Sequence, residues 1–177
     1  MGLAPEDLNY VPLGMTHRPR LEAPPKACEC HSHIYGPTDR YPMADGPDRN
    51  HHPDATVGEY RALLDWLGIE RAVIVQPVAH ATDNRRTVDA IAEFGRDRAR
   101  GVAICTPEVT DAELAELDAG GIRGVRIAGP TPDLPHDRMA DFAERIAPLG
   151  WHIQFQDEGT RALEWLPLLE KLPVPVV

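Results

Sequence analysis

Short apolar runs alternate with longer amphipathic stretches along most of the chain, and this alternation restricts the fold more than any other feature of the sequence. Each apolar run has the length of a buried strand, and each stretch after it repeats its apolar residues with a helical period. After the first unit, successive runs begin about 23 to 30 residues apart, as expected for β–α units that build a parallel sheet. The expected strands cover residues 27–35, 71–76, 101–105, 124–127 and 150–155, and a sixth begins at residue 173.

Signals for the ends of helices fall between these runs. A threonine followed three residues later by a glutamate, at 56–59 and again at 110–113, is a capping-box pattern that starts a helix. Gly68 is suited to end the first of these helices. Asp83 or Asn84 is expected to cap the helix between them. The sequence therefore predicts a regular succession of strands and helices.

Two architectures fit this succession, an open doubly wound sheet and a (β/α)8 TIM barrel. No glycine-rich dinucleotide-binding motif follows the first expected strand. Polar side chains instead end several strands, at the edge that carries the active site of a TIM barrel. These side chains belong to His33, Gln76, Arg126 and Gln154. We therefore predict an α/β fold of the (β/α)8 TIM-barrel type.

The length of the chain limits how much of a barrel it can form. A complete barrel needs eight strands and about 250 residues. The 177 residues provide five strands and the start of a sixth, so we expect an incomplete barrel, the N-terminal portion of a longer enzyme. Residues 1–26 are rich in proline and are expected to form an extended leader, and the barrel portion covers residues 27–177.

The composition restricts the partners of the chain. A formal net charge of −10 at pH 7 argues against nucleic acid and against anionic membrane surfaces. No apolar run approaches the roughly 20 residues that span a bilayer. Three cysteines do not suggest a disulfide framework, and we expect a cytoplasmic protein. A small anionic substrate remains compatible with this charge, and no feature of the sequence assigns an oligomeric state.

Two histidines stand two residues apart in the first expected strand, His31 and His33. Because side chains alternate between the faces of a strand, both are expected to point the same way as Glu29. Cys28 and Cys30 are then expected on the opposite face, in the core. Two imidazoles at the end of a strand bind a metal ion or polarise the carbonyl group of a substrate. The sequence leaves both roles open.

Four other residues are candidates for substrate binding. Arg126 ends an apolar strand, where a guanidinium is costly to bury without an anion. It either pairs with an acidic side chain of the protein or binds a substrate carboxylate, and we expect the second. Gln76 and Gln154 either contact the substrate or hydrogen-bond to their own loops. His80 lies in the loop after the second strand, where that loop is expected to overhang the pocket.

An ordered set of short motifs runs through the chain from Ala27 onward. The motifs are Cys28–Pro37, Asp39–Pro42, Ala72–Pro77, Thr82–Asn84, Arg100–Ala103, Gly121–Arg126 and Gly150–Gln154. Taken in this order, they resemble the amidohydrolase superfamily, and more narrowly its branch of lactonases for pyrone dicarboxylates and sugar acids. The family usually has aspartate at the position of Glu29, which is one methylene longer.

The resemblance implies a distorted TIM barrel and the hydrolysis of a lactone, ester or amide. His31 and His33 would be metal ligands in many members, whereas in the lactonase branch they act on the substrate carbonyl without a divalent metal. The expected cofactor is therefore none or one divalent metal, with zinc as the first candidate. Arg126 matches an arginine that pairs with a substrate carboxylate, and the general base is expected beyond Val177.

We therefore expect a hydrolase that opens a carboxylate-bearing lactone by water attack on a polarised carbonyl, with His31 and His33 as catalytic residues. Arg126, Gln76, His80 and Gln154 are expected to bind the substrate. One alternative is a metal-dependent decarboxylase or amide hydrolase on the same barrel. Another is a non-catalytic fragment of a barrel that binds a ligand or a partner.

Overall fold

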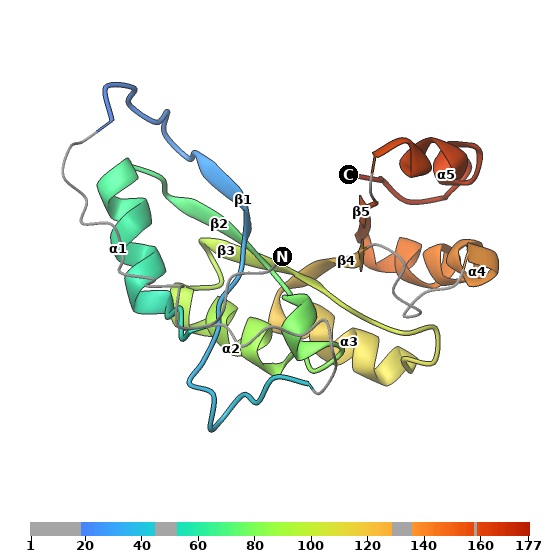
Figure 1. Cartoon of the computed structure of the whole chain (residues 1–177), viewed down its shortest axis with the longest axis horizontal. Helices are drawn as coiled ribbons and strands as arrows, with labels where there is room; N and C mark the ends of the chain where they lie inside the picture. The colour runs from blue at the N-terminus through green and yellow to red at the C-terminus, as the bar shows by residue number, and fades with distance from the viewer. Residues whose placement is uncertain (1–18, 45–52, 129–135, 158) are drawn as a thin grey trace, which may run out of the picture.

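The computed structural model describes residues 19–44, 53–128, 136–157 and 159–177, so most of the expected leader, residues 1–18, lies outside these ranges. Five parallel strands form one sheet (Figure 1): β1 (Cys28–Ser32), β2 (Arg71–Val75), β3 (Ala99–Ala103), β4 (Ile122–Ala128) and β5 (His152–Gln156). The helices are α1 (Val57–Leu67), α2 (Arg85–Phe94), α3 (Asp111–Gly120), α4 (His136–Ile146) and α5 (Ala162–Leu169). Three short 3-10 helices are η2 (Val78–His80), η3 (Ala147–Leu149) and η4 (Gly159–Arg161). Across the described ranges, no helix has the length and apolarity needed to cross a membrane.

The order of the strands in the sheet, β1-β2-β3-β4-β5, is their order along the chain. A doubly wound sheet reverses its strand order at a switch point, whereas a barrel does not. The observed order therefore favours the predicted barrel, present here as an open, curled half. The five expected strands are confirmed, but some of their ends differ from the prediction. β1 stops at Ser32 instead of residue 35, and β3 begins at Ala99 instead of residue 101.

Both predicted capping boxes are confirmed. The hydroxyl of Thr56 accepts a hydrogen bond from the backbone N–H of Glu59, whose carboxylate accepts one from the backbone N–H of Thr56. Residues 110–113 repeat this arrangement at the start of α3. Gly68 ends α1 with a left-handed φ of 74°, a conformation that favours glycine. Asn84 occupies the N-cap position of α2, but its side chain makes no capping hydrogen bond.

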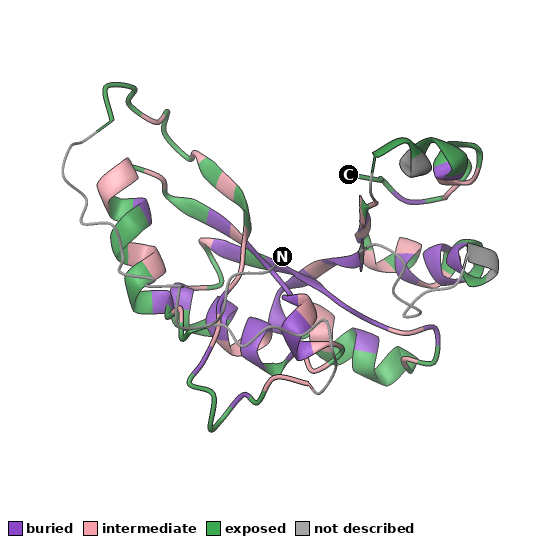
Figure 2. Cartoon of the chain, viewed as in Figure 1, coloured by how far each residue is buried: buried purple, intermediate pink, exposed green. Residues whose placement is uncertain are grey.

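The core lies between the sheet and its helices, and Figure 2 shows the buried residues concentrated along β2, β3, β4 and α2. Ile74, Ile122 and Val125 are completely buried in the sheet. Ile91 of α2 and Phe142 of α4 belong to the same apolar cluster. None of the five residues of β1 is buried, because this strand forms the edge of the described sheet.

The segment after α5 returns to the sheet and runs parallel to β5. Ile153 forms an isolated parallel bridge with Val176. The backbone N–H of Ile153 donates to the carbonyl of Pro175, and the N–H of Val177 donates to the carbonyl of Ile153, each at 2.9 Å. The predicted start of a sixth strand is therefore confirmed.

Candidate functional site

A row of four aromatic rings runs from the carboxyl end of β1 to the loop after β2. The ring centres of His31 and His33 lie 5.1 Å apart, with the planes at 81°. Tyr35 lies 6.3 Å from His33 and 5.9 Å from His80. The structure thus brings three predicted site residues together through Tyr35, which the sequence analysis did not select. Its two-residue spacing from His33 is the signal that could have identified it.

A β-bulge interrupts β1 just before the second histidine. From Glu29 to Ser32, β1 advances three residues while its partner β2 advances only two. A bulge changes the alternation of side chains, so the prediction that Glu29 shares a face with the histidines is wrong. The carboxylate of Glu29 instead turns to α1 and accepts a hydrogen bond from the hydroxyl of Tyr60 at 2.5 Å. It also accepts one from the backbone N–H of His31, at 2.8 Å.

Cys28 and Cys30 are exposed, so the prediction that they lie in the core is also wrong. The side chain of Glu29 points to α1, and β1 is an edge strand of the described sheet. Although the residue is exposed as a whole, partial shielding of its thiol from water and the neighbouring thiol of Cys30 raise the pKa of Cys28, which disfavours the thiolate that binds metal ions. Within the described ranges, no group of three or more histidine, cysteine or acidic side chains is placed to hold a metal ion.

The two histidines use their Nδ1 atoms in different ways. Nδ1 of His33 lies 2.8 Å from the carbonyl oxygen of Val75, the last residue of β2. Nδ1 of His31 lies 3.3 Å from the amide nitrogen Nε2 of Gln154 on β5. The second contact joins the first and last strands of the sheet, so the structure brings Gln154 to the histidine pair.

Arg126 is a nearly buried cation, with 9% of its surface exposed. Its Nη1 donates to the carbonyl oxygen of Gln76 at 3.3 Å, and its Nη2 donates to the side-chain oxygen of Gln156 at 2.5 Å. Both acceptors are uncharged, and Nε has no hydrogen-bond partner among the described residues. Burial lowers the pKa of Arg126, although the nearby Tyr35 opposes this shift.

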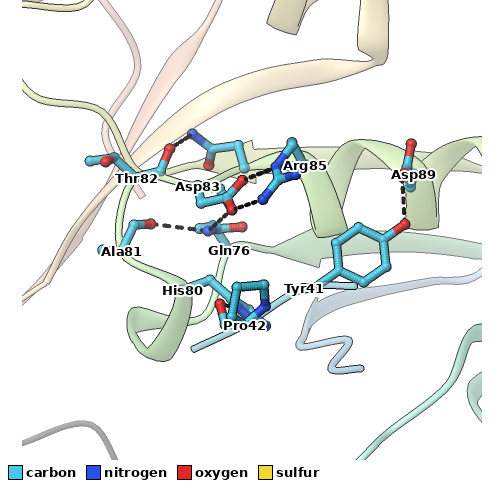
Figure 3. Close-up of polar contacts among 10 residues, drawn as sticks. Tyr41, Pro42, Gln76, His80, Ala81, Thr82, Asp83, Arg85 and Asp89 are labelled. Carbon is cyan, nitrogen blue, oxygen red and sulfur yellow. Dashed lines mark hydrogen bonds and ion pairs between the residues drawn. The ribbon is translucent and has the colours of Figure 1, made fainter. Parts of the chain in front are cut away.

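The side chain of Gln76 holds the loop that follows β2 (Figure 3). Its amide nitrogen donates to the carbonyl oxygens of Ala81 and Asp83, at 3.0 and 2.9 Å. Its side-chain oxygen accepts a hydrogen bond from the hydroxyl of Thr87 at 2.5 Å. Ala81 has a φ of 48°, which is costly for a residue other than glycine, so the bond to its carbonyl stabilises a strained turn. The side-chain amide of Gln76 is therefore occupied by the loop, and its contact with the site is the hydrogen bond that its backbone carbonyl accepts from Arg126.

Asn84 fixes the same loop to the end of β3. Its side-chain nitrogen donates to the carbonyls of Thr82 and Ile104, at 3.0 and 2.9 Å. Its side-chain oxygen accepts from the backbone N–H of Ile104 at 3.0 Å, so the amide pairs with Ile104 as another strand would. Sequence analysis missed this role, because Ile104 lies 20 residues further along the chain.

His80 is carried by this loop and is almost completely buried. Its Nδ1 lies 3.2 Å from the carbonyl oxygen of Pro42 (Figure 3). Its Nε2 has no hydrogen-bond partner among the described residues, and neither has the buried side-chain oxygen of Gln154. With Nε of Arg126, three predicted site residues each have one unpaired buried polar atom. Such atoms are uncommon in folded proteins and mark places where a ligand or water binds.

A cavity of about 720 Å³ lies elsewhere, between α2 and α3, and is lined by Tyr41, Arg85 and Glu113 among others. None of the six predicted site residues lines it in the described part of the chain. Its Arg85 is already paired with Asp83, and burial raises the pKa of the Cys105 thiol to about 12, so that thiol stays protonated. The candidate active site is therefore the carboxyl edge of the strands, not this cavity.

Comparison with known proteins gives one family. The family model described as "Amidohydrolase" matches residues 28–177. A relative named "2-pyrone-4,6-dicarbaxylate hydrolase", from Comamonas testosteroni, is 38% identical over 164 residues, which are 90% of this chain and 53% of the relative. A "D-galactarolactone isomerase" from Agrobacterium fabrum is 33% identical, over 87% of this chain and 52% of the relative. The chain thus spans about half the length of the curated relatives it matches.

Solved structures give the same fold. The apo structure of a protein from Agrobacterium tumefaciens is 29% identical and superposes with a TM-score of 0.78, over 89% of this chain and 57% of that one. A probable 2-pyrone-4,6-dicarboxylic acid hydrolase from Acinetobacter baumannii, 24% identical, gives a TM-score of 0.75 over 85% and 57% of the two chains. These neighbours are TIM barrels, so the predicted fold is confirmed and the barrel in this chain is incomplete.

Proposed function

The chain belongs to the amidohydrolase family, and on that basis we propose that it forms part of a hydrolase that opens a lactone carrying a carboxylate group. One relative named for the hydrolysis of a pyrone dicarboxylate and another named for a galactarolactone support this choice. The residues of the strand edge that carry the proposal are His31, His33 and Arg126. Gln154 and His80 complete the substrate site, while Gln76 positions the loop that carries His80.

The observation that carries the proposal is the buried guanidinium of Arg126. A buried charge is stable only when it is paired, because taking it out of water costs several kcal/mol. The described residues give Arg126 two uncharged oxygens and no carboxylate. A substrate carboxylate would supply the missing charge and would bind the guanidinium in the bidentate geometry that arginine favours.

The proposed reaction is the addition of water to the lactone carbonyl. The carbon–oxygen bond of the ring then breaks, leaving a carboxylate and a hydroxyl on one opened product. His31 and His33 lie beside each other at the strand edge, where an imidazole N–H stabilises the negative charge that develops on the carbonyl oxygen. We place the base that takes the proton from water beyond Val177, as the resemblance to the family implies.

Members of this family commonly bind a divalent metal. A catalytic zinc ion needs three protein ligands and an open position. His31 and His33 provide two imidazoles, and no third ligand joins them within the described ranges. We therefore derive the role of the pair without a metal.

We also propose a cytoplasmic enzyme that acts on a small anionic molecule. The described structure leaves Cys28, Cys30 and Cys105 as free thiols, which fits a reducing compartment. A net charge of −10 disfavours nucleic acid as a partner. The buried Arg126 is a positive charge within this negative protein, so an anionic substrate can still bind there.

The test compares two arginines of the same strand in the full protein. Arg126→Gln removes the proposed carboxylate ligand, and we expect KM for carboxylate-bearing lactones to rise about a hundred-fold. Arg123→Gln is the matched control, because Arg123 pairs with Asp118 on α3, away from the strand edge. Steady-state kinetics on a panel of pyrone and sugar-acid lactones, with and without a chelator, measure both. Absence of turnover on the whole panel, or equal effects of the two substitutions, would overturn the proposal.

A further inference from the structure

The contacts of the two histidines define where each ring carries its proton. A side-chain amide N–H only donates, so Nδ1 of His31 accepts from Gln154, and the ring proton of His31 lies on Nε2. A carbonyl oxygen only accepts, so Nδ1 of His33 donates to Val75, and in the uncharged ring the lone pair lies on Nε2. The two imidazoles are therefore opposite tautomers.

We propose that Gln154 is a positioning residue that fixes His31 as a hydrogen-bond donor through Nε2. The residue acts through His31 and not on the reacting atoms. The inference rests on the proposed function at one point, namely that the group that accepts the hydrogen bond from His31 is the carbonyl oxygen of the lactone. The tautomers themselves follow from contacts made without any ligand.

This arrangement bears on the choice between a metal and direct polarisation. A histidine that binds a metal through Nε2 donates its Nδ1 proton to a carbonyl or carboxylate oxygen. His33 has this geometry with Val75, but His31 has the reverse, because Gln154 gives a proton to Nδ1 instead of taking one. In the tautomer that Gln154 imposes, Nε2 of His31 carries a proton, whereas a metal ligand needs a lone pair on that atom. The divalent metal common in the family therefore does not fit this pair.

The same arrangement suits a carbonyl group. An N–H that is already oriented toward a developing oxyanion stabilises it without rearrangement during the reaction. The side-chain oxygen of Gln154 is buried without a partner in the described structure, and the amide donates to His31 with its other end. The direction of this one amide therefore decides whether His31 offers a proton or a lone pair.

Replacement of the amide tests the inference in the full chain. Gln154→Glu keeps the length of the side chain but has no N–H, so Nδ1 of His31 must donate to it and the lone pair moves to Nε2. We expect the affinity of the metal-free protein for Zn²⁺ or Co²⁺, measured by calorimetry, to rise about 10- to 100-fold. Metal-independent turnover should fall about a hundred-fold, the usual effect of losing one oxyanion donor. Gln154→Met, with neither donor nor acceptor, should show no gain in metal affinity.

Imidazole ¹⁵N shifts of the resting protein give a second readout that needs neither substrate nor a variant. The wild-type protein should show His31 protonated on Nε2 and His33 protonated on Nδ1.

Gln156→Glu is the matched control for Gln154→Glu, because it adds the same charge two residues along β5, where the partner is Arg126. It should leave the His31 signals and the metal affinity unchanged.

Two results would overturn the inference. One is a wild-type His31 that carries its proton on Nδ1, and the other is a Gln154→Glu protein with unchanged metal affinity. Both results are measured without a lactone. They can therefore be distinguished from a failure of the proposed function, which would appear as no turnover on any lactone.

Discussion

The loop after β2 and strand β1 both carry histidines of the candidate site, but the protein holds them by different means. The loop is fixed from inside by two buried amides, Gln76 and Asn84, whose donors and acceptors are all used. Strand β1 lies at the edge of the sheet, has no buried residue, and keeps its bulge through the single carboxylate of Glu29. The difference shows that His80 is placed by the folding of the core, whereas His31 is placed by a few polar contacts at the surface.

Removal of a buried amide should have the largest effect on stability. Asn84→Ala leaves the backbone N–H and C=O of Ile104 without partners in a position that is 4% exposed. We expect the free energy of unfolding to fall by about 3 kcal/mol, since each unsatisfied buried group costs about 1–3 kcal/mol. Denaturant unfolding of the full chain measures it.

Ser32→Ala is the matched substitution in β1. The hydroxyl of Ser32 reaches the carbonyl of Val73 only at 3.5 Å, so its loss should change the free energy of unfolding by less than about 0.5 kcal/mol. If both substitutions cost the same, the loop is not held by Asn84 in the way described.

Two glycines allow a similar comparison of how tightly the centre and the outer part of the sheet are packed. A Cβ atom at Gly101, in the central strand β3, would lie 2.7 Å from Ile91, 2.8 Å from Ile122 and 3.1 Å from the backbone oxygen of Ile74. These neighbours are buried and one is backbone, so Gly101→Ala should cost about 1–3 kcal/mol by overpacking. Thermal unfolding, with the change in melting temperature converted to free energy, provides the measurement.

The second glycine, Gly124, lies in β4 beside the outer strand β5. Its Cβ would meet only the ring of His152, at 2.5 Å, and this ring is partly exposed and can turn away. Gly124→Ala should therefore cost less than about 1 kcal/mol. An equal or larger cost than for Gly101→Ala would mean that β5 is packed as rigidly as the centre of the sheet.

The sequence was sufficient where structure depends on local signals. The capping boxes at 56–59 and 110–113, the end of α1 at Gly68 and the alternation of strands and helices were all predicted, because each is set by residues within a few positions. The gathering of His33, Arg126 and Gln154 at one edge followed from the parallel order of the strands. These predictions needed no knowledge of which side chains meet across the fold.

The errors arose where a distant contact decides the outcome. Glu29 and the two cysteines of β1 were misplaced because a bulge is set by pairing with β2 and by Tyr60, 31 residues away. Asp83 or Asn84 was predicted to cap α2; Asn84 occupies the N-cap position, but its side chain bonds to Ile104 instead of capping the helix. The carboxylate of Glu29 reaches both the bulge at His31 and the hydroxyl of Tyr60.

A pH-dependent effect is expected from the Tyr60–Glu29 contact, and it appears only at alkaline pH. Burial, and then the hydrogen bond to Glu29, raise the pKa of Tyr60 well above its ordinary value near 10. Above pH 10 the unfolded chain releases this proton while the folded protein keeps it, so the free energy of unfolding falls as pH rises. The contact therefore contributes its full stabilisation below pH 10 and loses it progressively above that pH. Because Tyr60 is partly exposed, we expect the loss to be no more than about 1 kcal/mol between pH 10 and 11.

Tyr60→Phe removes the phenol and should make the unfolding free energy less sensitive to pH in this range. Tyr41→Phe is the informative comparison, because burial and a hydrogen bond to Asp89 also raise the pKa of Tyr41, on the side of the molecule near α2. Urea unfolding at pH 8, 10 and 11 separates the two tyrosines. If only Tyr60→Phe also shifts the His31 imidazole signals at pH 8, the carboxylate of Glu29 links α1 to the site through the bulge. If neither substitution does so, the bulge is held by strand pairing alone, and the edge strand is more rigid than its exposure indicates.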